Sequence, residues 1–179
     1  MSRLAASLLA AAVFALPPAA RADDAMTTSS DARVNAKIDA IVSHTADSVV
    51  RAYGRPASFC AANHEPPLRS AEDSLKAFVA AVSTGTREGL VEIARTDADF
   101  RDSPVPDADT VDAMVDQQSN AIMKMLQANP AAGCQRFFAM IDASADAAEI
   151  KAATLQDRRD YLASRAPSCA GTPKPADCK

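Results

Sequence analysis

The sequence predicts an all-α protein, a compact bundle of five to six amphipathic helices cross-linked by disulfides. Several segments repeat apolar residues at steps of three and four, which is the period of an α-helix. No segment of strand length alternates apolar and polar residues, and neither an Asn-Gly nor an Asp-Gly hairpin pair occurs in the sequence. Four cysteines follow an export leader, a combination that indicates two disulfides.

The leader is a predicted signal peptide over residues 1–22. Arg3 precedes an apolar run, and Ala20-Arg21-Ala22 has the small-x-small form that signal peptidase cleaves. The run is shorter than the ~20 residues that a spanning helix needs, so we expect no transmembrane anchor in the mature chain. We therefore expect a periplasmic or secreted protein. Its expected parts are a mobile lead-in at 23–30, a helical domain at 31–166 and a disulfide-closed tail at 167–179.

Capping and stop signals predict six helices. Gly54, followed by Pro56, indicates the end of the first helix, and Gly85 the end of the second. Asn129 with Pro130 predicts a capped start for the fifth helix, directly after the fourth, so these two are expected to pack antiparallel. The expected helices cover approximately residues 30–52, 70–84, 86–97, 107–128, 130–141 and 146–164, with loops at 55–69 and 97–106.

The fifth helix is predicted to be the centre of the core. Cys134, Phe137, Phe138 and Ile141 fall at i, i+3, i+4 and i+7, which places them on one face. The charged side chains of the sixth helix, Arg158 among them, are expected to form a solvated face. The predicted core consists of Val34, Ile38, Ile41, Leu75, Phe78, Val82, Ile122, Leu126, Phe137, Phe138 and Ile141.

The four cysteines allow three pairings. The favoured one joins Cys60 to Cys134 and Cys169 to Cys178, because the segment between the last two is rich in Pro and Gly and can double back. The competing arrangement brings a tail cysteine back to the core. In the favoured pairing, the long bridge between Cys60 and Cys134 is expected to contribute much of the stability of the domain.

The sequence contains no recognisable catalytic motif. Gly-x-Ser-x-Gly, His-Glu-x-x-His, a phosphate-binding glycine loop and Cys-x-x-Cys do not occur. Cys60 and His64 have the spacing of a zinc or thiol–imidazole pair, but a zinc site needs three or four ligands and exported cysteines are oxidised. We expect no enzyme, metal or cofactor, although an enzyme built on carboxylates stays open. Met114, Met123, Met125 and Met140 are interpreted as core filling rather than as copper ligands or a binding groove, because helical spacing places Met114 and Met125 on the core stripe and Met140 beside the central face.

Seven aspartates in twenty residues form an acidic band, interrupted by Arg101. They are Asp97, Asp99, Asp102, Asp107, Asp109, Asp112 and Asp116. One interpretation is favourable charge at a helix N-terminus. A second is a docking face for a basic partner. A third is a weak calcium site, but Arg101 occupies a ligand position of such a loop and Asp102 replaces its turn glycine.

Composition and charge limit the classes of function that we consider. A formal net charge of −4 and few aromatic residues argue against binding to nucleic acid. The leading hypothesis is an exported non-enzymatic protein that binds another macromolecule, expected to be a protein, as an inhibitor, immunity protein or envelope accessory factor does. The alternative is a helical bundle that encloses a small apolar ligand such as a lipid. An apolar pocket above ~300 Å³ would favour the alternative, and a packed interior would favour the first.

Overall fold

The predicted all-α class is confirmed by the structure, a computed structural model that describes residues 27–63, 71–104 and 108–165. Six helices make up these ranges. They are α2 (Thr27–Asn63), α3 (Ala71–Thr96), α4 (Ala98–Asp102), α5 (Ala108–Ala128), α6 (Pro130–Ser144) and α7 (Ala147–Arg165).

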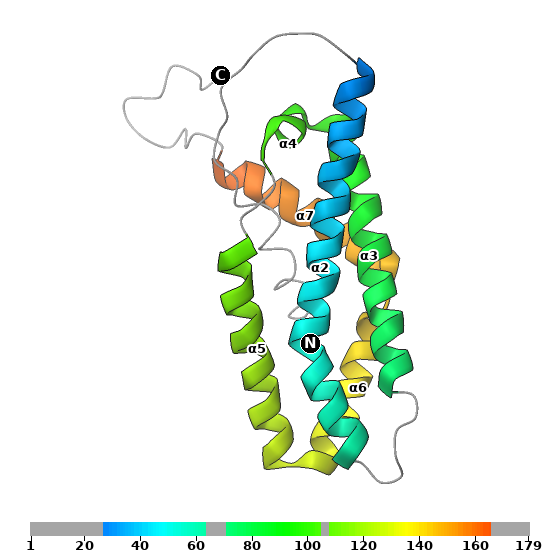
Figure 1. The fold of residues 1–179 in the computed structure, drawn as a ribbon, viewed down its shortest axis with the longest axis vertical. Coiled ribbons are helices and arrows are strands. Elements are labelled where there is room, and N and C mark those ends of the chain that lie inside the picture. The colour runs from blue at the N-terminus through cyan, green and yellow to red at the C-terminus, as the bar shows by residue number, and fades with distance from the viewer. Residues whose placement is uncertain (1–26, 64–70, 105–107, 166–179) are drawn as a thin grey trace, which may run out of the picture.

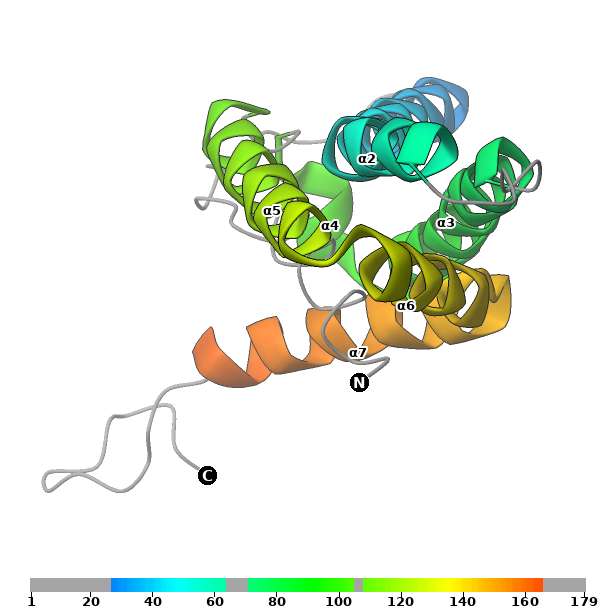
Figure 2. The same ribbon diagram turned by 90° about the horizontal axis from the view of Figure 1, so that it is seen from below.

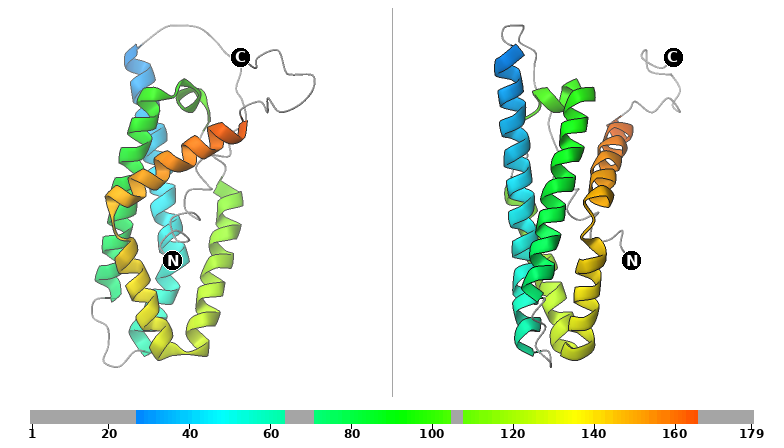
Figure 3. Two further views of the ribbon diagram at one scale, coloured as in Figure 1. Left: turned by 180° about the vertical axis from the view of Figure 1, so that it is seen from behind. Right: turned by 90° about the vertical axis from the view of Figure 1, so that its right-hand side faces the viewer.

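The helices form an elongated bundle along two long antiparallel helices (Figure 1). α3 packs on both α2 and α7, and α2 also packs on α5. Seen from below, α5, α2, α3 and α6 surround a common core (Figure 2). α5 and α6 run in opposite directions, as their short connection predicts, while α7 crosses α3 obliquely and rises toward α4 (Figure 3).

The predicted end of the first helix at Gly54 is wrong. α2 begins at Thr27, inside the expected lead-in, and continues through Pro56 to Asn63, so residues 55–63 are helical rather than part of a loop. Proline inside a helix removes a hydrogen bond and costs ~3 kcal/mol. Here the Pro56 side chain is fully buried, and Cys60 one turn later is bonded to α6. We infer that these tertiary contacts offset the local penalty.

The predicted helix end at Gly85 is also wrong, because residues 71–96 form one helix. A Cβ atom at Gly85 would clash with the carbonyl oxygen of Ala147 and lie 2.8 Å from Cβ of Ile150. A Cβ atom at Gly89 would lie 2.9 Å from Cβ of Thr154. The two glycines therefore allow the close crossing of α7 over α3.

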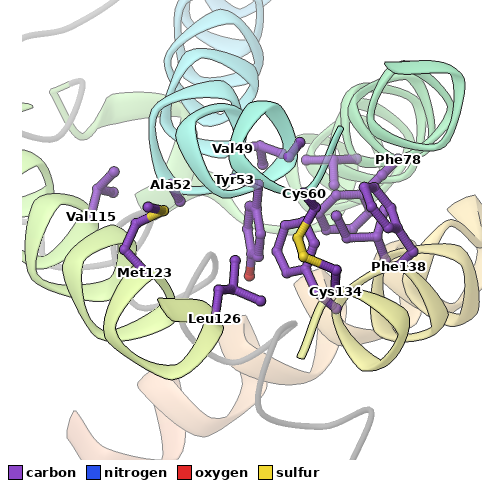
Figure 4. Packing of buried hydrophobic residues seen from close by; sticks show 14 of the residues in the cluster. Val49, Ala52, Tyr53, Cys60, Phe78, Val115, Met123, Leu126, Cys134 and Phe138 are labelled. Atoms are coloured by element: carbon purple, nitrogen blue, oxygen red, sulfur yellow. A yellow bond between two sulfur atoms is a disulfide. The ribbon is translucent and has the colours of Figure 1, made fainter. Parts of the chain in front are cut away.

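Two hydrophobic clusters fill the interior. The larger lies between α2, α3, α5 and α6 around Tyr53 (Figure 4). The ring of Tyr53 is 5.5 Å from that of Phe78 and 6.1 Å from that of Phe137. The smaller lies between α2, α3 and α4 and includes Leu90 and Phe100. Of the predicted core residues, the structure buries Ile38, Ile41, Phe78, Val82, Leu126, Phe137, Phe138 and Ile141, and half-buries Val34, Leu75 and Ile122.

A disulfide joins Cys60 of α2 to Cys134 of α6, and both side chains are fully buried in the larger cluster. This is the bridge that the sequence favours. The second expected pair, Cys169 with Cys178, lies outside the described residues. The bridge fixes the C-terminal end of α2 against the start of α6, the helix whose apolar face contains Phe137 and Phe138.

The predicted burial of the methionines on α5 is wrong for two of them. Met114 and Met125 are 38% and 51% exposed, whereas Met123 is buried. The buried stripe of α5 is rotated away from Met114 and Met125. Its buried residues are Val111, Val115, Ser119, Met123 and Leu126.

Candidate functional site

The acidic band is not one continuous surface. Arg51 of α2 lies 2.6 Å from a carboxylate oxygen of Asp112 and 3.0 Å from one of Asp116, so this part of the band links α2 to α5. Asp99 and Asp102 are exposed on α4 and form no ion pair within the described part of the chain.

Two further aspartates of the band fall outside what the structure describes. Asp107 precedes the described start of α5, and the side chain of Asp109 lies outside the described residues. Asp97 would be the first ligand of the calcium loop considered above. Both of its carboxylate oxygens are already hydrogen-bonded within the protein, which argues against that interpretation.

Asp97 organises the short helix α4. One carboxylate oxygen accepts a hydrogen bond from the Phe100 amide at 3.0 Å, which caps the helix, and the other accepts one from Arg158 Nε at 2.6 Å. Burial opposes ionisation of Asp97, but the hydrogen bonds from Arg158 and Phe100 outweigh it and lower the pKa of Asp97. The prediction that Arg158 is solvated is therefore wrong. Its side chain is 5% exposed, and its guanidinium carbon lies 5.0 Å from the centre of the Tyr161 ring.

Lys37 of α2 holds the other end of α4. Its side chain is buried, and Nζ donates hydrogen bonds to the carbonyl oxygens of Phe100 and Ser103 and to Ser103 Oγ. Nζ also lies 4.3 Å from the centre of the Phe100 ring, a cation–π contact. Burial, with repulsion from Arg158, lowers the pKa of Lys37 to about 8. Two buried cations, from α2 and α7, thus position α4.

A groove of about 540 Å³ opens to solvent between α3, α4 and α7. Ile93, buried on α3, and Leu155, half-buried on α7, contribute apolar surface to it. Leu162 of α7 is 41% exposed. Asp99 on the α4 side and Arg159 on the α7 side are both exposed, so the two walls carry opposite charges.

The remaining candidates from the sequence are dispersed. Cys60 is oxidised, and His64 lies outside the described residues. Nε2 of His44 is buried with no hydrogen-bond partner, but no three metal-binding side chains come together within the described ranges. No helix in these ranges is long and apolar enough to cross a membrane.

No family model, curated protein or solved structure matches this chain. Its function is therefore inferred from the geometry of its own residues. Sequence reasoning missed the groove and the two buried cations. A signal existed for Arg158, which continues the inward stripe of Ile150 and Thr154 at a spacing of four residues.

Proposed function

We propose that this protein is an exported, non-enzymatic protein that binds a protein partner, and that the groove between α3, α4 and α7 is the contact surface. The observation that carries the proposal is that the exposed Leu162 and the half-buried Leu155, both on α7, line a groove with the oppositely charged Asp99 and Arg159. Protein interfaces combine an apolar centre with a polar rim in this way. A partner that inserts an apolar side chain against Leu155 and Leu162 would find opposite charges at Asp99 and Arg159.

The packing favours this function over the enclosure of an apolar ligand. The groove exceeds ~300 Å³, but it is open to solvent and carries charged side chains such as Asp99 and Arg159, whereas apolar-ligand sites bury most of the surface of the ligand. The space between α2, α3, α5 and α6, where an enclosed ligand would lie, is occupied by Tyr53, Phe78, Leu126 and the disulfide (Figure 4). A protein partner is thus the better-supported occupant.

Leu162→Asp is expected to reduce partner binding by about tenfold or more, because a charge would enter the apolar centre of the interface. The measurement is capture of partners from envelope extract by the mature oxidised protein, followed by determination of Kd for the captured protein. Met125→Asp is the matched control, since Met125 is also an exposed apolar residue on a helix but lies on α5 outside the groove. Equal binding by both variants and the wild type would contradict the assignment of the groove.

Export makes a separate prediction. N-terminal sequencing of protein recovered from the periplasm or medium is expected to begin at Asp23 or within two residues of it, because Ala20-Arg21-Ala22 forms the cleavage site. A cytoplasmic product that retains residues 1–22 would contradict the proposed location.

A further inference from the structure

We propose that Lys37 is a positioning residue that controls α4 and, through α4, the shape of the groove. Control of α4 stands on the geometry below. Its effect on partner binding rests on the proposed function.

α4 depends on contacts from outside itself. It has five residues, too few to form a stable isolated helix. At its N-terminal end, Asp97 is both its cap and the hydrogen-bond partner of Arg158 on α7. At its C-terminal end, the carbonyl groups lack partners within the helix, and Lys37 supplies hydrogen bonds to the oxygens of Phe100 and Ser103.

The Phe100 side chain connects α4 to the core. It is fully buried in the smaller cluster, beneath the amine of Lys37. Displacement of α4 would therefore expose Phe100 and hydrate Lys37 in one step. Since α4 contributes Asp99 and Ala98 to the groove, the same step would change one of its walls.

The protonation of Lys37 couples this step to pH. The charged groups that act on its amine are Arg158 of α7, Asp102 of α4 and Asp97 before α4. Carboxylates and guanidinium groups ordinarily titrate outside pH 7–9, which leaves the amine as the group that changes charge. In the docked state, in which α4 is packed as the structure shows, the pKa of Lys37 is about 8. In a displaced state with a hydrated amine, the pKa would have its ordinary value of 10.5.

The displaced state therefore binds a proton more tightly than the docked state, so protonation favours displacement. Raising the pH through 8 is expected to hold α4 more firmly. The opening constant is the equilibrium ratio of the displaced state of α4 to its docked state. If displacement fully hydrates Lys37, linkage gives a decrease of about tenfold in this constant between pH 7 and pH 9.

Amide hydrogen exchange tests the control of α4. The reporters are the amides of Phe100, bonded to Asp97, and Ser103, bonded to the Asp99 carbonyl. After correction for intrinsic exchange, their opening constants are expected to fall about tenfold from pH 7 to pH 9. Lys37→Met should remove this fall, and Lys76→Met, which changes an exposed lysine, should retain it. The same pH dependence in Lys37→Met would overturn the proposal.

Two further measurements keep the test decisive. If Lys37→Met does not fold, Lys37→Arg keeps the cation without titrating in this range and should also give a flat profile. Affinity for the captured partner is then compared at pH 7 and pH 9 for the wild type and Lys76→Met. An amide response accompanied by unchanged affinity would retain the control of α4 and contradict the groove as the binding site. A flat amide profile in the wild type would overturn the coupling to pH, and equal opening constants at pH 7 in the wild type and Lys37→Met would overturn the control of α4 itself.

Discussion

Replacing both Cys60 and Cys134 with Ser is expected to lower the free energy of unfolding by ~2–5 kcal/mol. The bond closes a loop between residues 74 positions apart, and its loss increases the conformational entropy of the unfolded chain. It also removes the covalent link between the C-terminal end of α2 and the start of α6 in the larger cluster. Since domains of this size have a total stability of ~5–15 kcal/mol, the variant should lie much closer to its unfolding threshold.

Urea unfolding at equilibrium measures this loss. Wild-type protein unfolded in the presence of a reductant is the control, because it lacks the bond without a change of side chain, and the double variant is unfolded in the same reductant so that Cys169 and Cys178 are reduced in both proteins. We expect the reduced wild type and the double variant to lose similar stability. A loss below ~1 kcal/mol in both would show that the bridge contributes little to the fold.

Gly85→Ala is expected to destabilise the protein by ~1–3 kcal/mol, the usual cost of overpacking. An alanine inside a helix is normally better than glycine by ~1 kcal/mol, so the predicted sign opposes helix propensity. The reason is the clash that a Cβ atom would make with the Ala147 carbonyl oxygen, where backbone must move.

Gly54→Ala is the matched control for this prediction. Gly54 also lies inside a helix, but the nearest atom to its added Cβ is Cγ1 of Val50 at 3.9 Å. This variant should gain ~0.5–1 kcal/mol, because propensity acts there without a clash. Thermal unfolding of both variants decides the question, and equal stabilisation of the two would contradict the close crossing of α3 and α7.

Signals that act within a few residues predicted the structure well. Asn129 accepts a hydrogen bond from the Ala132 amide and Pro130 begins α6, as their order in the sequence indicates. The apolar spacing of Cys134, Phe137 and Ile141 likewise corresponds to a buried face. Both features depend on local backbone geometry, which a short segment determines by itself.

Pro56 and Gly85 misled the prediction because distant partners decide their roles, whereas Gly54 is a glycine that the helix tolerates without any facing partner. A glycine at the end of a helix and a glycine under a crossing helix look the same in the sequence. Pro56 lies inside α2, and its side chain is fully buried there. The facing helices that make these positions tolerable or necessary are known only once the chain has packed.

The candidate site was less predictable than the fold for the same reason. Lys37 and Arg158 occupy inward positions of amphipathic helices, where a charge is normally read as surface. Their partners are more than sixty residues away in sequence. The short helix α4 fell in an expected loop, because its stability comes from those partners rather than from its own five residues.

Site-specific photo-crosslinking in the envelope tests the central claim most directly. A photoreactive side chain is placed at position 162 in the groove, at position 159 on its α7 wall, or at position 125 on α5 as a control. We expect positions 162 and 159 to give the same discrete crosslinked protein and position 125 to give none of it. A discrete crosslinked protein from position 125, with none from positions 162 and 159, would contradict the groove as the partner-binding surface.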